Sequence, residues 1–422
     1  MSDHQIQNPT KFEADIVSAY RARANPNRMH DAAFARFCAG GMPGRRDEGW
    51  RWSDIGGVLR NEDGAINAPA LNTVAPSVFS GLNPIEFRII NGEIMMPPQS
   101  EMENAGGVAW TILDNLGTIP ELDANPVVSL NVAMTDKALG VEVRAPKAES
   151  GAAMAQPRPI LIRHINEAAG SCFVQCMLRV GEGASATFIE TFEGAGAVLG
   201  SCLNQIVMHK NSNAQRYVVN QQGREGVTHA VCGVRVEKDC SYTQTSLSTG
   251  SKLSRHETIV HYHGENARAQ LDSVAILSDS AHADFTTNVL HKKPGCTTRQ
   301  LHRSVGADKA SSVFQGKFEV ERVAQKTDSQ MTANALLLSE RAQANHKPEL
   351  EIYADDVECA HGSTSGALDQ DQLFYLRQRG LSEREARQLL IKAFASNVIE
   401  RVGDDSIRDV LSGRIDQWLE NV

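Results

Sequence analysis

The chain has 422 residues, 41% of them hydrophobic and 22% charged, which is ordinary for a folded protein of more than one domain. A formal net charge of −9 argues against nucleic acid or an anionic membrane surface as the main partner, and 5% aromatic residues leave few rings to stack on bases or sugars. The N-terminal sequence lacks a basic and apolar leader, and no stretch approaches the roughly 18 apolar residues of a membrane span, so we expect a cytoplasmic protein.

Residues 1–104 are predicted to form an N-terminal domain of helical and mixed structure. The segment FEADIVSAYRARA places Phe12 and Ile16 on one helical stripe. The following loop, GMPGRRDEGWRWSDIGGVL, carries two tryptophans that we expect to anchor it on a small core. The segment EFRIINGEIMM predicts a β-hairpin with its turn at Asn91 and Gly92.

Residues 105–362 are predicted to form a β-rich core. Short runs of strand-forming residues, such as VVSLNVAM, PILIRHI, HAVCGVRVE and LEIYADDVE, alternate with turns, and convincing amphipathic helices are absent. This alternation of short strands and turns suggests a large β-sandwich, a propeller or a β-solenoid. A Gly-led turn, a small residue and a strand recur unevenly at residues 181, 264 and 306, which favours the solenoid. Its narrow interior also suits the low aromatic content.

Residues 363–422 are predicted to form a C-terminal helical domain. Asp369 can cap a first helix that Gly380 stops, and Ser382 with Glu385 forms a capping box for a second. An aspartate pair before SIRDVL can cap a third helix. Three helices of this size bury little alone, so we expect them to dock on the β-core or to offer an apolar groove to a partner.

No common enzyme signature is complete in this sequence. The P-loop pattern is absent, GAGAVLG misses the dinucleotide fingerprint, GSTSG has threonine where a nucleophile elbow needs serine, and HETIVH spaces its histidines five apart instead of four. We therefore predict no catalytic residue and no permanently bound cofactor. Cys172 and Cys176 would share one strand face, and we interpret them as small buried hydrophobes. The eight cysteines suit a reducing compartment.

The stretch DDVECAHGSTSGALDQD sets Cys359 two residues before His361. On a strand both side chains would point the same way, and a thiolate with an imidazole suits soft or borderline metals such as iron and zinc. A complete metal site needs three or four ligands. These two residues therefore predict an incomplete site whose other ligands come from elsewhere.

The run from Leu336 to Ala386 resembles the C-terminal signature of the SufB/SufD family, scaffold components of the Suf system of iron–sulfur cluster assembly. The shared patterns are LLLS…A…KP.LEI.ADDV.C.HG and LD…LFYLR.RG. Two other segments, GMPGRRDEGWRWSDI and LHRSVGADKASSVFQGKFEVERVAQKTDSQ, resemble further family regions, so the resemblance covers most of the chain. Gly362 after His361 and Cys359 before it resemble the SufD branch, whereas the SufB branch reads HEATTS. The SufD branch usually reads HGATVG, and this chain reads HGSTSG.

This resemblance implies a non-enzymatic subunit with a right-handed parallel β-helix core between helical N-terminal and C-terminal domains. It implies SufB as the partner of the β-helix and the SufC ATPase as the partner of the C-terminal helices. His361 and Cys359 would be ligands, shared with SufB, of a transient iron–sulfur cluster or iron ion, and closure of SufC could reach them through the helices. In isolation two copies could pair as a homodimer. The residues expected to contact SufC are Leu373, Phe374, Leu390, Phe394 and Val398.

Two other functions remain open from the sequence. A β-helix enzyme acting on polysaccharides would need aromatic and acidic clefts, for which aromatic residues are few. A stand-alone iron carrier would bind iron stoichiometrically on the isolated chain, for which two ligands are too few.

Overall fold

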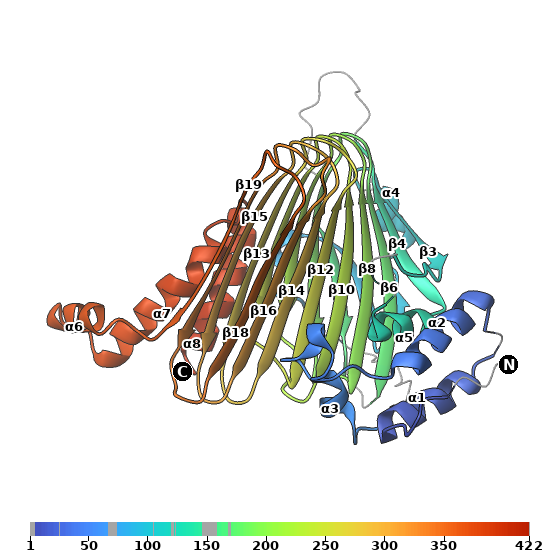
Figure 1. The fold of residues 1–422 in the computed structure, drawn as a ribbon, viewed down its shortest axis with the longest axis horizontal. Coiled ribbons are helices and arrows are strands. Elements are labelled where there is room, and N and C mark those ends of the chain that lie inside the picture. The colour runs from blue at the N-terminus through green and yellow to red at the C-terminus, as the bar shows by residue number, and fades with distance from the viewer. Residues whose placement is uncertain are drawn as a thin grey trace.

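The computed structural model describes residues 5–24, 26–65, 74–103, 105–119, 122, 124–145, 158–167 and 170–421. A long β-structure forms the body of the molecule, and helices lie at both of its ends (Figure 1). This arrangement confirms the predicted fold class of a β-solenoid core flanked by helices.

The N-terminal segment forms a small helical layer on one end of the body. Phe12 and Ile16 are fully buried, which confirms the predicted helical stripe. The loop is anchored as expected through Trp50, which is buried beneath the guanidinium of Arg255, 4.1 Å from its ring, whereas Trp52 is half-exposed. The helices of this segment are α1 (Lys11–Arg21), α2 (Arg28–Gly40) and α3 (Ile55–Leu59), with the short 3-10 helices η1 (Glu48–Trp50) and η2 (Ser80–Leu82).

Two sheets wind into the solenoid, and each coil gives one strand to each sheet. Neighbouring strands run parallel, except that β2 and β3 pair antiparallel with β1 and β4. The first sheet follows the order β2-β1-β5-β7-β9-β11-β13-β15-β17-β19. Its strands are β1 (Ile85–Ile90), β2 (Glu93–Met95), β5 (Ile160–Ile165), β7 (Ser185–Glu193), β9 (Asn213–Asn220), β11 (Ser241–Ser248), β13 (Arg268–Leu277), β15 (Thr297–Gly306), β17 (Asp328–Leu337) and β19 (Glu358–Gly366). The second follows β3-β4-β6-β8-β10-β12-β14-β16-β18 and contains β3 (Val108–Asp114), β4 (Lys137–Val143), β6 (Ser171–Val180), β8 (Leu199–Met208), β10 (Val227–Val236), β12 (Leu253–Tyr262), β14 (His282–His291), β16 (Ser311–Val320) and β18 (Gln343–Ile352).

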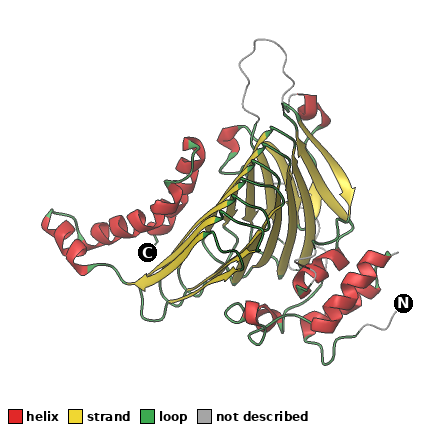
Figure 2. Ribbon diagram, turned by 45° about the horizontal axis from the view of Figure 1, so that its top comes forward, coloured by secondary structure: helices red, strands yellow, loops and turns green. Residues whose placement is uncertain are grey.

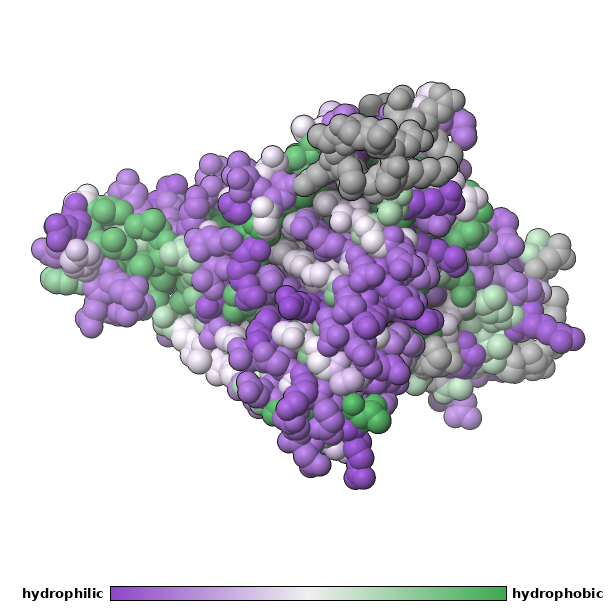
Figure 3. Space-filling model, turned by 90° about the horizontal axis from the view of Figure 1, so that it is seen from above, coloured by the Kyte–Doolittle hydropathy of each residue, from purple (hydrophilic) through white to green (hydrophobic). Residues whose placement is uncertain are grey.

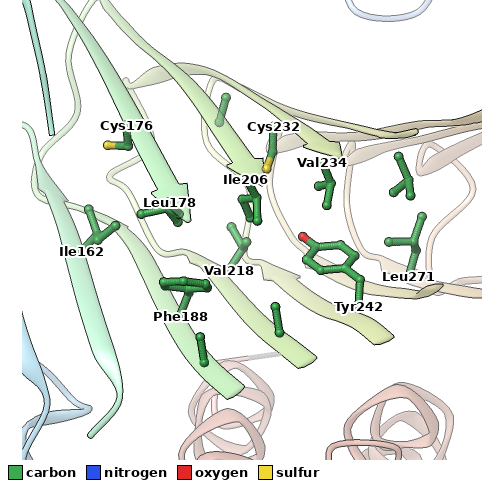
Figure 4. Close-up of a cluster of buried hydrophobic side chains, with 14 of the residues drawn as sticks. Ile162, Cys176, Leu178, Phe188, Ile206, Val218, Cys232, Val234, Tyr242 and Leu271 are labelled. Carbon is green, nitrogen blue, oxygen red and sulfur yellow. The ribbon is translucent and has the colours of Figure 1, made fainter. Parts of the chain in front are cut away.

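The solenoid interior stacks small and β-branched side chains together with larger ones, among them Phe188, Tyr242 and Phe314. Equivalent positions of successive coils stack in register, so a residue of one strand packs on its counterparts above and below. Figure 4 shows this interior, with Cys176 and Cys232 pointing into it beside Ile206 and Val218. Cys176 is fully buried, as expected, whereas Cys172 is half-buried. All eight cysteines are free.

The hairpin predicted around Asn91 and Gly92 is confirmed. Both residues have positive φ, 50° and 90°, as a tight turn between β1 and β2 requires. Because β1 also pairs in parallel with β5, with Ile85 opposite Ile160, the sheet begins before residue 105. A short helix, α4 (Gln99–Glu103), follows the hairpin.

The run VVSLNVAM, interpreted as a strand, is a helix instead. Helix α5 (Pro126–Met134) begins with Pro126 after Asn125, whose side chain accepts hydrogen bonds from the backbone N–H groups of Val127 and Val128. Residues 127–133 are all buried between α2 and the sheet. A helix that is buried on every side carries no polar stripe, so its sequence resembles that of a buried strand.

The C-terminal helices are α6 (Gln370–Gln378), α7 (Glu383–Ile399) and α8 (Asp405–Leu419). The predicted caps at Asp369, Ser382 and Asp404 are confirmed. Helices α7 and α8 pack against the first sheet, and α6 projects away from the body (Figure 2). Among the described residues, no helix combines the length and the apolar character needed to cross a lipid bilayer.

Candidate functional site

The last coil of the solenoid carries the two residues that the sequence marks as metal ligands. Strand β19 has β17 as its sheet neighbour and β18 has β16, and neither has a second neighbour within the described part of the chain. The solenoid therefore ends in two free strand edges. A free edge presents unpaired backbone groups and is a template for pairing with another chain.

Cys359 and His361 lie on the same face of β19, as expected for a strand. They are the register partners of Ser329 and Met331, whose side chains are buried at 0% and 1% exposure. In-register side chains of parallel strands point the same way, so Cys359 and His361 face the side of the sheet that forms the interior one coil earlier. His361 is exposed and Cys359 half-buried, and burial raises the pKa of the Cys359 thiol.

The backbone N–H groups of β19 point alternately toward β17 and toward the free edge. The backbone N–H of Glu358 donates to the carbonyl of Thr327, 2.9 Å away, at the start of the pairing with β17. Backbone groups alternate in direction along a parallel strand, so the N–H groups of Cys359, His361 and Ser363 point to the free edge. The two candidate ligands thus share their strand edge with unpaired donors.

The free edge of β18 lacks one backbone N–H donor, at Pro348. Gln343 donates its N–H to the carbonyl of Ala310, so by the same alternation the position of Pro348 faces outward, where proline offers no N–H. His346 lies on the interior-facing row of this strand, with its ring 6.2 Å from that of Phe314. Burial lowers the pKa of His346, and its Nε2 atom has no hydrogen-bond partner among the described residues.

The acidic residues beside the candidate ligands are not gathered around His361. The Asp356 carboxylate pairs with the Lys326 ammonium group, and the Asp356 backbone N–H donates to Gln325 Oε1 at 3.0 Å. Asp355 and Glu358 are exposed. Strand alternation turns the Glu358 side chain away from the face that carries His361.

The residues predicted to bind the SufC ATPase do not form one exposed surface in this chain. Val398 is fully buried and Leu373 is 6% exposed. Leu390 and Phe394 are half-buried in the cluster that joins α7 to the first sheet, whereas Phe374 is 64% exposed.

Exposed apolar side chains nevertheless gather on the projecting end of the molecule. Phe374 lies beside Tyr375 in α6, and Leu389 follows in α7; the latter two are 57% and 48% exposed. Figure 3 shows hydrophobic surface on this projecting end, at the left of the view. We call Phe374, Tyr375 and Leu389 the helical apolar patch.

A second cluster of ligand-type side chains lies inside the solenoid and carries no sequence motif. His164, Glu190 and Cys202 come from three different strands, and their donor atoms all lie within 4.8 Å of one another. No short spacing marks them in the sequence, because only the winding of the coils brings them together. They were not predicted.

The charges of this buried cluster are coupled. Burial disfavours the ionised Glu190 carboxylate, but the Arg216 guanidinium and the His164 imidazole outweigh burial and hold the pKa of Glu190 below its usual range. Burial also opposes a charge on His164, yet the neighbouring Cys202 and Glu190 raise its pKa to about 10. Burial raises the pKa of the Cys202 thiol well above its usual value.

Comparison with known proteins places the chain in one family. Residues 163–394 match the family model described as SUF system FeS cluster assembly, SufBD core domain. The iron–sulfur cluster assembly protein SufD of Escherichia coli is 28% identical over 387 residues, which cover 90% of both chains. A SufBD family protein of Synechocystis is 29% identical, with 90% of this chain and 87% of that protein covered. The chloroplastic protein ABCI7 of Arabidopsis thaliana is 32% identical over 54% of this chain and 49% of its own length.

Proposed function

Because the chain belongs to the SufBD family of the SUF iron–sulfur cluster assembly system, we propose that it is a non-enzymatic scaffold subunit that shares an unfinished metal site with a partner. The observation that carries this proposal is the position of Cys359 and His361 on the free edge of the last coil. A thiolate and an imidazole supply two ligands, and a partner that pairs with the edge supplies the rest. Iron, or a cluster under assembly, is the cargo of this site.

The proposed partner at this edge is SufB, a second β-helix of the same family. Pairing through β19 extends the sheet into the partner and satisfies the outward N–H groups of Cys359, His361 and Ser363. A ligand set divided between two subunits suits an assembly site, because separating the subunits dismantles the site and releases the cargo. Without SufB, two copies of this chain offer the same edge to each other, which favours a homodimer in isolation.

The proposed partner of the C-terminal helices is the SufC ATPase. The helical apolar patch supports this assignment, since exposed apolar side chains on two consecutive helices at the projecting end suit a protein–protein contact. Helix α6 begins at Gln370, nine residues after His361, and is joined to β19 by a short connection. Movement of α6 by a bound ATPase therefore acts close to the shared edge, and we propose that nucleotide-driven closure opens the site.

The experiment that tests this function is co-expression of the chain with SufB and SufC. The wild type is compared with His361→Ala and with a control, His209→Ala, whose half-exposed imidazole follows strand β8 and lies 3.6 Å from Glu237. The complex should form in all three cases, and iron and sulfide content should fall at least tenfold in His361→Ala alone. An unchanged cluster content in His361→Ala removes this imidazole from the ligand set.

A further inference from the structure

A buried side-chain cluster of the first coils has the composition and spacing of a metal site. His164 Nε2 lies 2.9 Å from Glu190 Oε1, and Cys202 Sγ lies 3.8 Å from the same nitrogen and 3.7 Å from the same oxygen. The three residues come from β5, β7 and β8, so the two sheets meet at this point of the interior. Their donor atoms are a nitrogen, an oxygen and a sulfur.

We propose that His164, Glu190 and Cys202 bind one divalent first-row transition ion, such as Zn²⁺ or Fe²⁺, inside this subunit. This site does not depend on the shared edge that carries His361. It lies in the early coils, and all its ligands belong to one chain.

The spacing of the three atoms suits tetrahedral coordination. Metal bonds of about 2.0 Å to nitrogen, 2.1 Å to oxygen and 2.3 Å to sulfur place ligand atoms about 3.4–3.6 Å apart around the ion. The two distances from Cys202 are already close to this range. The distance between His164 and Glu190 is a direct hydrogen bond and opens by about 0.5 Å when the ion replaces the proton between them.

Neighbouring residues hold the ligands in the required orientation. Arg216 Nε donates to Glu190 Oε2 at 3.1 Å, and its Nη2 donates to the same atom, which leaves Oε1 toward His164 and Cys202. The His164 ring stacks on Phe192 with 4.6 Å between centroids, so it cannot turn freely. Partners of this kind, which fix a ligand without touching the ion, are a regular feature of protein metal sites.

A small cavity beside the cluster offers space and a way in. It has a volume of about 10 Å³, close to the volume needed by one water-sized occupant, and His164, Cys172 and Cys202 line it. Cys172 also lines a surface cavity of about 530 Å³, together with Gly92 and Asp136. The half-buried Cys172 thiol therefore lies between the outer cavity and the buried cluster, on a route for an entering cation.

Binding exchanges protons for the ion. The Cys202 thiol loses its proton when it binds the ion, and an imidazole binds through a nitrogen that carries no proton, so metal binding should strengthen as pH rises. Without an ion the same residues form a closed hydrogen-bond network, since Asn204 Nδ2 also donates to Glu190 Oε1 at 2.6 Å. A measurement of bound metal therefore distinguishes a cluster that holds an ion from one that holds only this hydrogen-bond network.

The test uses Co²⁺ as a probe on the isolated full chain in a Cys359→Ser, His361→Ala background, which removes the terminal ligands. We expect one equivalent of Co²⁺ to bind with a thiolate-to-cobalt charge-transfer band. Cys202→Ser should abolish this band, and Glu190→Gln should weaken binding by about 10–100-fold. The matched control, Cys296→Ser, removes another fully buried thiol and should leave the band unchanged.

X-ray absorption of the Zn²⁺-loaded Cys359→Ser, His361→Ala chain, whose internal cluster is unchanged, keeps the test independent of whether the variants of that cluster fold. One sulfur neighbour at about 2.3 Å, with nitrogen or oxygen neighbours at about 2.0–2.1 Å, is expected. The absence of stoichiometric Co²⁺ binding, a band that persists in Cys202→Ser, or a zinc shell without sulfur would each overturn the proposal. None of these outcomes bears on the shared edge, which the background variant lacks.

Discussion

His361 occupies on the last coil the position that Met331 occupies one coil earlier. The two residues are register partners in β19 and β17, yet Met331 is 1% exposed whereas His361 is exposed. The same strand face is core wherever another coil covers it and surface where the solenoid ends. A polar, metal-binding side chain is therefore compatible with the fold at this end, and a docked partner would cover it as a further coil would.

The pairing of β19 with a partner can be tested through the alternation of its backbone. Ser363→Pro removes an N–H that points to the free edge, and the pairing with β17 keeps its bonds. We expect the free energy of unfolding of the isolated chain to change by about 1 kcal/mol or less, and the affinity for SufB to fall at least tenfold. Urea unfolding and calorimetric titration measure the two effects.

Thr364→Pro is the control for this prediction, because its N–H points inward to β17. This variant should lose stability in the isolated chain, in contrast to Ser363→Pro. If Ser363→Pro binds SufB with wild-type affinity, β19 is not the pairing edge.

The helical apolar patch predicts different outcomes for exposed and buried positions of the C-terminal helices. Phe374→Asp removes an exposed ring and should leave the free energy of unfolding within about 0.5 kcal/mol of the wild type, while SufC binding falls at least tenfold. Val398→Ala creates a cavity in the buried cluster and should cost about 2 kcal/mol. Co-purification with SufC and thermal unfolding separate the two roles. Wild-type binding of SufC by Phe374→Asp would place the docking surface elsewhere.

An ion pair between the solvent-exposed Arg401 and the buried Asp272 joins the C-terminal helices to β13. Arg401 Nε lies 3.2 Å from the carboxylate of Asp272, whose side chain has no exposed surface. Burial raises the pKa of Asp272 to about 6 against the attraction of Arg401. We expect Arg401→Ala to lower the free energy of unfolding by about 1–3 kcal/mol at neutral pH, because it leaves a buried carboxylate unpaired.

The pH dependence of this variant has a definite sign. A carboxyl group whose folded pKa lies above its unfolded value binds more protons in the folded state, so stability falls as pH rises between the two values. Removal of Arg401 raises the folded pKa further and should extend this fall above pH 6. Urea unfolding from pH 5 to pH 8 measures this fall. Arg414→Ala on α8 serves as control, since Arg414 Nη1 donates to Gln417 Oε1 on the same helix at 2.9 Å. Parallel pH profiles for the two variants would contradict the prediction.

His291 predicts the opposite pH dependence. Burial lowers its pKa to about 3, below the ordinary value of 6.5 expected in the unfolded chain. The unfolded chain therefore binds the extra proton first, and the stability due to the neutral ring is complete above pH 6.5 and is lost as pH falls toward 3. We expect a loss of about 2 kcal/mol between pH 7.5 and pH 5 from this residue.

His291→Gln checks this value, because an amide can still accept hydrogen bonds from the hydroxyls of Thr298 and Ser329, which lie 3.1 Å from the His291 Nε2 atom. Unfolding measured at pH 5 and pH 7.5 should show a smaller difference for this variant than for the wild type. His209→Gln, at a half-exposed position, serves as control. An equal difference in all three proteins would show that His291 does not govern the acid response.

The repeat of the solenoid was only faintly visible in the sequence, and the coil lengths explain why. Successive register positions along the first sheet are separated by 28, 27, 29, 31 and 30 residues, at Asn213, Ser241, Arg268, Thr297, Asp328 and Glu358. Because the coil length varies by a few residues, the sequence shows no fixed repeat length. The turns absorb the difference, because the strands need only keep their inward rows in register.

The shared strand face of Cys359 and His361 could be predicted, and the internal cluster could not. Cys359 and His361 are two residues apart, so strand geometry alone places them on one face. His164, Glu190 and Cys202 are 26 and 12 residues apart on β5, β7 and β8, and no local rule joins them. The helix α5 was missed for a related reason, since burial on every side removes the periodicity that marks a helix.

The most direct test of the shared site is the binding of Fe²⁺ under anaerobic conditions, measured in a Cys202→Ser background that removes the internal thiol ligand. The isolated chain, kept monomeric by dilution, should show no His361-dependent iron binding, and its complex with SufB should gain about one iron site that His361→Ala abolishes. His361-dependent binding of equal strength by the isolated chain, or a gain in the complex that survives His361→Ala, would contradict a site divided between two subunits.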